Sequence, residues 1–241
     1  MKKYFILILL SLFLFGCEKR EDRLVMVTEA SFAPFEYYSD GKIVGVDVDI
    51  ANEVAKRLGK KLVVKDVSFD SIITEIRSGK SDMGVAGISY TEERSKAVSF
   101  SESYTVSRQV AIVRKNSAFN NVNDMVCDKI AVQLGSIADG YVTDEFVNSK
   151  IIRQKKYLAA IEDLKDNKVD CVVMDELPAK EMVNENSNYI RILDGELAED
   201  SYGIVVNKDN YELLNVVNEV IRDLKSEGKV DEYILFHSKN G

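Results

Sequence analysis

The sequence contains few of the residues that bind metals or serve as bases for a nucleophile. Its 241 residues include one histidine, His237, near the C-terminus, and three cysteines. A histidine-based zinc site needs several imidazoles, and a Ser-His-Asp triad needs a histidine beside its serine. The cysteines also lack the CxxC spacing of metal and redox motifs. We therefore expect no triad, no metal and no cofactor, and we place His237 on the surface of a terminal helix.

The chain also lacks a surplus of basic residues. Its 40 acidic residues outnumber its 32 lysines and arginines, so the net charge is -8 at pH 7. Nucleic-acid binding needs a basic face, so we expect no nucleic-acid partner. With 46% hydrophobic and 30% charged residues, a chain of this length can fold as one or two globular domains.

The N-terminal segment differs from the rest of the chain. A basic start at residues 1–3 precedes an apolar run at 4–15 that is too short to span a bilayer comfortably. The run ends in Gly16 and Cys17, which resembles a bacterial lipoprotein signal cleaved before Cys17, with lipid attached to its sulfur. An uncleaved anchor is the alternative, and both place the protein outside the cytoplasm. We predict a signal peptide at 1–16 and a charged tether at 17–23, with the acyl chain as the membrane contact.

The other two cysteines, Cys127 and Cys171, lie near segments that we predict to be neighbouring strands. In an exported protein they could form a disulfide. Two separate buried thiols agree equally well with the sequence, so both alternatives stay open.

Strand-like and helix-like runs alternate along the chain, which predicts an α/β fold with mainly parallel pairing. The predicted strands are 24–28, 62–67, 83–86, 130–134, 151–157, 171–174 and 190–193. The predicted helices are 46–58, 69–77, 137–147, 158–165, 211–225 and 230–236, with a short helical stretch that ends at Glu181.

Residues 45–49 superficially resemble a calcium loop. The chain lacks the downstream glycine and glutamate of an EF-hand at the required spacing. We therefore interpret Asp47 as the cap of helix 46–58.

A weak internal repeat relates two parts of the chain. Residues 73–87 align without gaps with residues 161–175, and each segment reads as helix, turn, Lys-x-Asp and strand. Any βαβ unit can produce this pattern, but a true repeat would place Gly87 and Asp175 at equivalent strand ends. Open α/β sheets bind ligands at those ends, so two facing ends would form a cleft.

The segment from Gly87 to Arg94 joins a predicted strand to a predicted helix start. Ser89 and Thr91 are good N-caps, and Glu92 follows Ser89 at the spacing of a capping box. Free backbone N–H groups and the Arg94 guanidinium would together suit a carboxylate. A plain strand-to-helix turn with a solvated arginine is the alternative.

Six segments together resemble the extracytoplasmic solute-binding proteins of the polar amino-acid family (family 3), the receptors of ABC importers. In family order the segments are 28–37, 45–50, 69–70, 87–94, 132–136 and 174–178, and the match spans about 24–236. The resemblance implies a two-lobed fold of the periplasmic-binding-protein-like type II. Each lobe would have a mainly parallel sheet flanked by helices, and a two-stranded hinge would join them. It assigns 24–107 and 201–241 to lobe 1 and 108–200 to lobe 2.

The resemblance also implies how the cleft holds a free amino acid. Arg94 and Ser89 would bind the α-carboxylate, and Ile88 belongs to the same binding segment. Asp175 would pair with the α-ammonium, which would also donate to the backbone of Gly87.

A helix start in lobe 2 would add to the carboxylate site, through Ser136 and the N–H of Ile137. Many relatives have Thr and Gln where this chain has Ile137 and Ala138. That change removes side-chain hydrogen bonds, so the pocket is more apolar there or Gln133 takes over the duty.

Three further residues would face the ligand's side chain. Phe32 and Phe69 match the family's pair of rings that sandwich it. Glu29 matches a position at the far end of a long side chain, where it would suit arginine or lysine or accept from a glutamine amide; a solvated loop carboxylate is the alternative.

The resemblance implies a monomeric binding protein without catalysis that delivers a free L-amino acid to the permease subunits of an ABC transporter. A dehydratase-type enzyme on the same scaffold is one alternative, with Glu29 as its candidate proton donor. An amino-acid-sensing receptor domain is another, which we disfavour because the chain ends at Gly241 without a second membrane segment. Which amino acid binds, whether cationic, glutamine-like or other, is not readable from the sequence.

Overall fold

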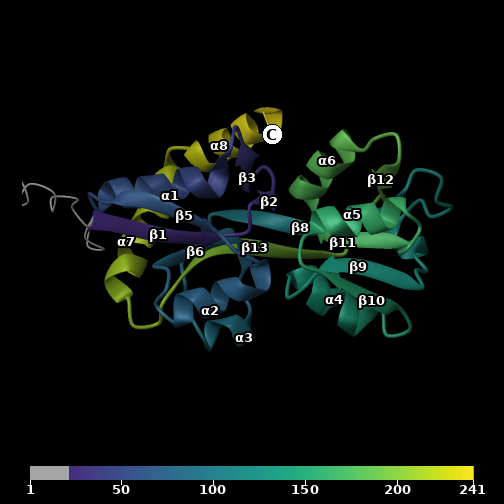
Figure 1. The fold of residues 1–241 in the computed structure, drawn as a ribbon, viewed down its shortest axis with the longest axis horizontal. Helices are drawn as coiled ribbons and strands as arrows, with labels where there is room; N and C mark the ends of the chain where they lie inside the picture. The colour runs from purple at the N-terminus through teal and green to yellow at the C-terminus, as the bar shows by residue number, and fades with distance from the viewer. Residues whose placement is uncertain (1–21, 241) are drawn as a thin grey trace, which may run out of the picture.

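Two long antiparallel strands, β8 (Thr105–Arg114) and β13 (Ala198–Val206), cross the middle of the molecule between two groups of helices and strands (Figure 1). The computed structural model describes residues 22–240. The strands pair from Ala198 opposite Gln109 to Tyr202 opposite Thr105. The predicted lobe boundaries fall inside these two strands, which form the hinge expected from the sequence.

Lobe 1 contains both ends of the described chain. Its parallel strands lie in the order β5-β1-β6, and β6 then pairs with β13 in antiparallel fashion. The strands are β1 (Arg23–Thr28), β5 (Lys61–Asp66), β6 (Met83–Ser89) and the short β7 (Ser99–Phe100). The helices are α1 (Val46–Arg57), α2 (Ile72–Arg77), α3 (Glu92–Ser95), α7 (Tyr211–Ser226) and α8 (Lys229–Asn240), with a 3-10 turn at Phe69–Ser71.

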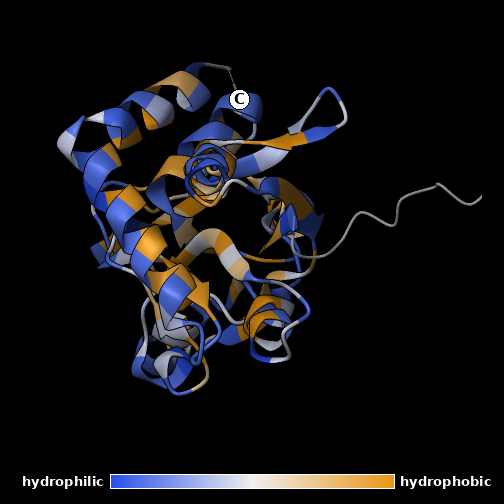
Figure 2. Ribbon diagram, turned by 90° about the vertical axis from the view of Figure 1, so that its left-hand side faces the viewer, coloured by the Kyte–Doolittle hydropathy of each residue, from blue (hydrophilic) through white to orange (hydrophobic). Residues whose placement is uncertain are grey.

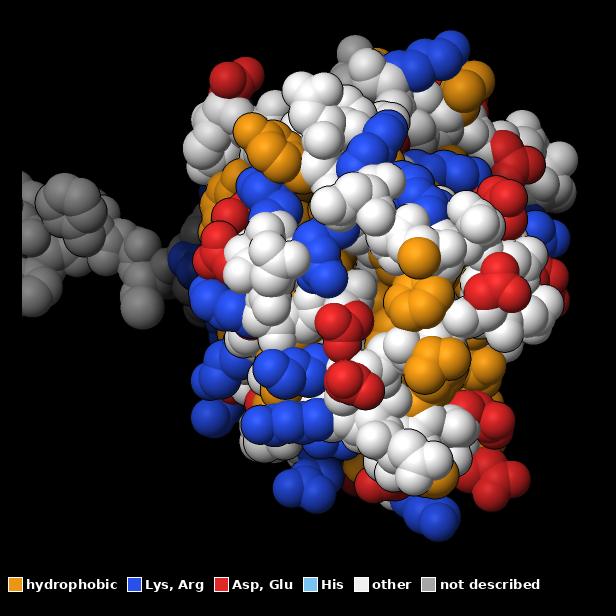
Figure 3. Space-filling view, turned by 90° about the vertical axis from the view of Figure 1, so that its right-hand side faces the viewer, with side chains coloured by type: hydrophobic (Ala, Val, Ile, Leu, Met, Phe, Trp, Pro, Cys, Tyr) orange, Lys and Arg blue, Asp and Glu red, His pale blue; other side chains and the backbone are white. Residues whose placement is uncertain are grey.

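Lobe 2 is built from the middle of the chain. Its parallel strands lie in the order β10-β9-β11, and β11 pairs with β8 in antiparallel fashion, as does β12. The strands are β9 (Lys129–Gln133), β10 (Lys150–Gln154), β11 (Cys171–Asp175) and β12 (Ile190–Ile192). The helices are α4 (Ile137–Glu145), α5 (Tyr157–Lys165) and α6 (Glu176–Glu185), with a 3-10 turn at Val122–Asp124. The end of lobe 2 carries lysine and arginine side chains interspersed with acidic ones (Figure 3).

The sheet strands of the two lobes form one continuous path, β10-β9-β11-β8-β13-β6-β1-β5. The prediction of a mainly parallel α/β fold flanked by helices is therefore confirmed. Each predicted strand and helix matches an observed one, with ends that differ by a few residues.

A small antiparallel sheet in lobe 1 was not predicted. It consists of β2 (Ser31–Phe32), β3 (Glu36–Ser39) and β4 (Lys42–Val44). The tight turn between β3 and β4 uses Asp40 and Gly41, both with positive φ. Gly45 follows β4 with φ 133°, and a Cβ there would lie 2.0 Å from the Phe35 carbonyl oxygen, so this junction requires glycine.

Helical periodicity explains how the outer helices pack. In α7 the buried residues are Leu213, Val217, Val220, Ile221 and Leu224, which lie on one face. The helices of lobe 1 carry hydrophobic and hydrophilic residues side by side (Figure 2). The strand β6 is buried along its whole length. Within residues 22–240, no helix has both the length and the apolar character needed to cross a bilayer.

The prediction that His237 lies on the surface is wrong. Its side chain on α8 is buried, with Nε2 2.8 Å from Asp49 Oδ2 and Nδ1 3.1 Å from the Tyr37 hydroxyl. A polar side chain can be buried when its hydrogen-bonding groups are satisfied, and here both ring nitrogens have partners.

The structure decides between the two alternatives for Cys127 and Cys171, which are free, buried thiols. Burial and the neighbouring Cys127 raise the pKa of Cys171. Residues 1–16 and Cys17 lie outside the described residues, so the predicted signal and lipid attachment remain predictions.

Candidate functional site

A cavity of about 10 Å³ lies between the lobes, near the carboxyl ends of β6 and β11. Every predicted binding residue except Ile88 lines it. The lining residues are Glu29, Phe32, Glu36, Phe69, Ala86, Gly87, Ser89, Arg94, Gln133, Ser136, Ile137, Tyr157 and Asp175. The side chain of Ile88 packs instead into the core of lobe 1 with Val27 and Ile72.

Arg94 projects from the one-turn helix α3. Thr91 is the N-cap, and its Oγ1 accepts from the Arg94 N–H at 3.0 Å; Ser89 is the last residue of β6. The guanidinium donates to the Ser89 carbonyl at 2.6 Å and, across the cleft, to the Gly135 carbonyl at 2.7 Å. It also lies 5.5 Å from the centre of the Phe69 ring, so Phe69 packs against Arg94. Burial lowers the pKa of Arg94 from its usual range.

Gly87 allows the close approach that shapes the cavity wall. Its φ is 52°, and a Cβ there would lie 2.9 Å from a Phe32 ring carbon. Its N–H donates to Asp47 Oδ2 at 2.9 Å, and the Tyr104 hydroxyl donates to Asp47 Oδ1 at 2.8 Å. The prediction that Asp47 caps helix 46–58 is wrong, because Gly45 is the N-cap of α1 and the Asp47 carboxylate accepts from Gly87 and Tyr104 instead. Burial raises the pKa of Asp47 to about 6.

Asp175 at the end of β11 is held by the hinge strands. Its Oδ1 accepts from Ser107 Oγ at 2.7 Å, from Gln109 Nε2 at 2.9 Å and from the Tyr202 hydroxyl at 2.5 Å. Burial and the charge of Asp200 raise the pKa of Asp175 to about 7. Because these hydrogen bonds converge on Oδ1, Oδ2 is the oxygen that can face a ligand cation.

Glu36 on β3 is a cavity residue that the sequence analysis did not single out. It is 1% exposed, and no described lysine or arginine forms an ion pair with it. Its Oε2 receives no hydrogen bond from a donor among the described residues, and its carboxyl group lies against that of Asp47. Burial and the charge of Asp47 raise the pKa of Glu36 well above its usual range. Two buried carboxyl groups therefore lie side by side in the wall of the cavity.

Glu29, by contrast, is fully paired. Its carboxylate is 2% exposed and accepts from Ser31 Oγ at 2.7 and 2.8 Å. From lobe 2, Gln133 Nε2 donates at 3.1 Å and Lys156 Nζ lies 2.9 Å away. The sequence analysis did not single out Lys156.

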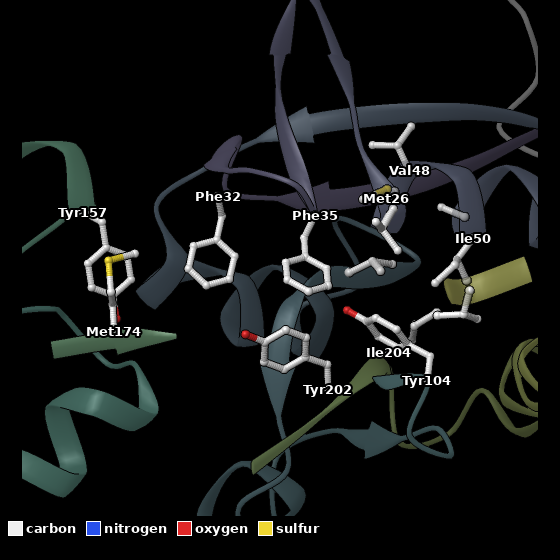
Figure 4. Close-up of a cluster of buried hydrophobic side chains, with 14 of the residues drawn as sticks. Met26, Phe32, Phe35, Val48, Ile50, Tyr104, Tyr157, Met174, Tyr202 and Ile204 are labelled. Carbon is white, nitrogen blue, oxygen red and sulfur yellow. The ribbon is translucent and has the colours of Figure 1, made fainter. Parts of the chain in front are cut away.

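Aromatic rings cross the cleft beside these charges. Tyr157 of lobe 2 stacks on Phe32 of lobe 1 with ring centres 5.9 Å apart and planes inclined by 23°. Phe35 and Tyr202 continue the row of rings into lobe 1 (Figure 4). Tyr157 also donates to Ser136 Oγ, which caps α4 by accepting from the Asp139 N–H.

The lobes are closed on one another in this structure. Arg94–Gly135, Glu29–Lys156 and Phe32–Tyr157 all join lobe 1 to lobe 2. The 10 Å³ cavity has room for about one water molecule. A larger ligand needs the lobes to separate, and β8 and β13 are the strands that join them.

A two-lobed α/β fold with charged groups converging at a closable cleft defines a ligand-capturing binding protein. Residues 24–235 match the model of the bacterial extracellular solute-binding proteins, family 3, and the chain belongs to this family.

Individual relatives agree with this assignment. The chain is 28% identical to the arginine-binding extracellular protein ArtP of Bacillus subtilis, with 90% of this chain and 86% of ArtP covered. It is 28% identical to a probable histidine-binding protein of Campylobacter jejuni, with 97% and 98% covered. The structure of the amino acid ABC transporter substrate-binding protein AbpA from Streptococcus pneumoniae, bound to L-arginine, superposes with a TM-score of 0.86 at 36% identity, covering 91% and 95%.

The predicted family, and the predicted function as the amino-acid-binding component of an ABC transporter, are thereby confirmed. The family and these relatives are binding proteins, and the family's name places them outside the cytoplasm.

Proposed function

We propose that the protein captures free L-arginine outside the cytoplasm and delivers it, as a monomer, to the permease subunits of an ABC transporter. The observation that carries the choice of arginine is Glu36, a buried carboxyl group in the cavity wall that has no cationic partner among the described residues. Of the other lining acids, Glu29 is already paired with Lys156, which leaves Asp175 for the α-ammonium and Glu36 for a second positive charge on the ligand. A ligand with one net positive charge balances this cavity better than a neutral amino acid does.

The two ends of the ligand's backbone have separate partners. The α-carboxylate would accept from Arg94, Ser89 and the start of α4 at Ser136 and Ile137, because a carboxylate is a stronger acceptor than the carbonyl groups that Arg94 now contacts. The α-ammonium would donate to Asp175 Oδ2 and to the backbone of Gly87.

The guanidinium would reach Glu36 between aromatic walls. Phe32 and Tyr157 already stack across the cleft, and a planar guanidinium stacks well on such rings. Phe69 is committed to Arg94, so we assign the sandwiching pair to Phe32 and Tyr157 in place of Phe32 and Phe69. The ligand's cation would then form an ion pair with the Glu36 carboxylate.

The cellular placement follows the sequence. We propose cleavage before Cys17, lipid attachment to Cys17, and lobes that divide at 107/108 and 200/201, where β8 and β13 cross. Mass spectrometry of the mature N-terminus tests the lipid attachment. The dehydratase alternative loses its candidate proton donor, because Glu29 is paired with Lys156.

A calorimetric comparison of arginine, lysine, histidine and glutamine tests the choice of ligand, on protein that begins after Cys17. We expect arginine to bind most tightly, and Glu36→Gln to weaken arginine at least about tenfold more than glutamine. Glu53→Gln on α1, which does not line the cavity, serves as the matched control. Tighter binding of glutamine than of arginine, or equal losses for both ligands in Glu36→Gln, contradicts the proposal.

A further inference from the structure

We propose that Glu29 and Lys156 form a latch that holds the two lobes together in the closed state, and that Glu29 does not contact the ligand's side chain. The latch goes beyond the proposed function and requires only that the two lobes open and close.

The latch joins two segments that are far apart in the sequence. Glu29 follows β1 in lobe 1, and Lys156 is the N-cap residue of α5 in lobe 2. Lys156 Nζ lies 2.9 Å from Glu29 Oε1 and 3.7 Å from Asp66 Oδ2. Glu29 is 2% exposed and Lys156 43% exposed, so the lysine closes over a carboxylate that is otherwise buried.

Both oxygens of the Glu29 carboxylate already have partners, and one of these is a cation. Oε1 accepts from Ser31 and contacts Lys156, and Oε2 accepts from Ser31 and Gln133. Ser31 has one hydroxyl proton, which lies between the two oxygens, so three donors serve a carboxylate that offers about four lone-pair sites, and one of the three is already a cation. A guanidinium at Glu29 would have to displace Lys156 and withstand its positive charge.

The neighbouring acid has the opposite character. Glu36 has no cationic partner among residues 22–240, lies beside Asp47 in lobe 1, and lines the same cavity. The two glutamates therefore have different roles. Glu36 binds the positively charged side chain of the ligand, and Glu29 pairs with Lys156 to hold the lobes together.

Closure of the two lobes depends on the pairing of Glu29 with Lys156. Two of the Glu29 partners, Gln133 and Lys156, come from lobe 2, so they leave when the lobes separate and water replaces them. A desolvated carboxylate without a cation is strongly unfavourable, so closure without Lys156 would bury an unpaired charge. Burial lowers the pKa of Lys156, but Glu29 and Asp66 outweigh burial and the net shift is upward, which keeps the lysine charged.

Asp66 gives Lys156 a second acceptor at the cleft edge. Its Oδ1 accepts from the Ala30 N–H at 3.0 Å, and its Oδ2 accepts from the Tyr38 hydroxyl at 3.3 Å. Because both partners of Asp66 belong to lobe 1, its carboxylate is held in place whether or not lobe 2 has brought Lys156 to it.

Stopped-flow measurement of arginine dissociation tests the latch. The variants are Glu29→Gln, Lys156→Met and their combination, with Lys156→Arg as the conservative replacement. The matched control is Lys180→Met, which removes an exposed lysine paired with Glu176 inside α6. We expect each single latch variant to speed dissociation about tenfold with little change in association. The double variant should be no faster than the faster single variant, because the two residues act as one unit. Lys156→Arg should keep most of the wild-type lifetime, and Lys180→Met all of it.

Ligand choice gives the second readout. Glu29→Gln should weaken arginine and glutamine by the same factor, since both ligands need the closed state. If Glu29→Gln weakened the binding of arginine alone, Glu29 would contact the ligand's side chain, and this result would overturn the latch. Wild-type dissociation rates in both Glu29→Gln and Lys156→Met would overturn it as well.

A third measurement needs no ligand and separates the latch from the proposed function. Pulsed electron paramagnetic resonance measures the distance between a spin label on lobe 1 and a spin label on lobe 2. Glu29→Gln and Lys156→Met should shift the ligand-free protein towards longer separations, and Lys180→Met should not. If no amino acid bound the wild-type protein, the proposed function would fail while this comparison still tested the latch. Unchanged separations in both latch variants refute it.

Discussion

The Tyr202 hydroxyl donates to Asp175 Oδ1 at 2.5 Å, which ties the end of β11 in lobe 2 to β13 at the hinge. Ser107 and Gln109 of β8 donate to the same oxygen. The proposed acceptor for the α-ammonium is therefore anchored to the two strands that join the lobes. Arg94, the proposed partner of the carboxylate, lies on α3 of lobe 1 and reaches lobe 2 at Gly135.

Arginine affinity should fall as the pH drops below about 7. Burial and Asp200 raise the pKa of Asp175 to about 7, and the protonated acid cannot form an ion pair with an ammonium. Binding must therefore release that proton, and affinity should fall by up to about tenfold per pH unit below this value. Glu36 acts in the same direction, because burial raises its pKa. Calorimetry over a pH series, in two buffers of different ionisation enthalpy, measures both the affinity and the released protons.

Asp175→Asn is the control for this pH dependence. The variant should bind more weakly and lose the part of the pH dependence that Asp175 causes. A variant curve that runs parallel to the wild-type curve would assign the pH dependence to other groups.

Arg94→Ala should abolish binding of every amino acid tested, because all of them share the α-carboxylate. Removing one partner of a buried charge-assisted contact weakens binding by at least about 2 kcal/mol, or roughly thirtyfold. Calorimetry with arginine and glutamine measures the loss. Arg153→Ala is the matched control, since Arg153 pairs with Asp139 and does not line the 10 Å³ cavity. Binding within tenfold of wild type would remove Arg94 from the site.

The sequence located the binding segments because strand ends can be read from local patterns. Gly87 and Asp175 each end an apolar run, and the structure brings both to one cavity. Thr91 rather than Ser89 caps α3, because β6 continues through Ser89 and the chain turns one residue later.

The missed residues depend on contacts that no local pattern encodes. Glu36 lies on a short strand of the small sheet, where too few residues alternate to reveal a strand. Lys156 and Tyr157 reach the site only because lobe 2 closes on lobe 1. The signal for Glu36 was present as an acid directly after Phe35 in the family motif, but its burial follows from the tertiary fold.

The ligand-free protein should lose stability through Asp47 as the pH rises from about 4 to about 7. Burial raises the folded-state pKa of Asp47 from 3.8 to about 6, so the folded protein binds this proton more tightly than the unfolded chain. Asp47 therefore adds about 3 kcal/mol to the free energy of unfolding at a pH below its unfolded-state pKa. This stabilisation is lost as the pH rises through its folded-state pKa. Urea unfolding of the wild type and Asp47→Asn over this range isolates it. The difference between the two free energies of unfolding should change by about that amount, whereas a constant difference would contradict the shift.

His237→Ala should destabilise lobe 1 without changing ligand choice. The substitution removes a buried imidazole and leaves the half-buried Asp49 and Tyr37 without their partner, and each lost hydrogen bond costs about 0.5–1.5 kcal/mol. Urea unfolding measures the loss, and Lys239→Ala, an exposed change on the same helix, should have little effect. Because His237 does not line the cavity, arginine affinity should stay within about twofold of wild type once the protein is folded. Unchanged stability in His237→Ala would mean that the two hydrogen bonds do not hold α8 against α1.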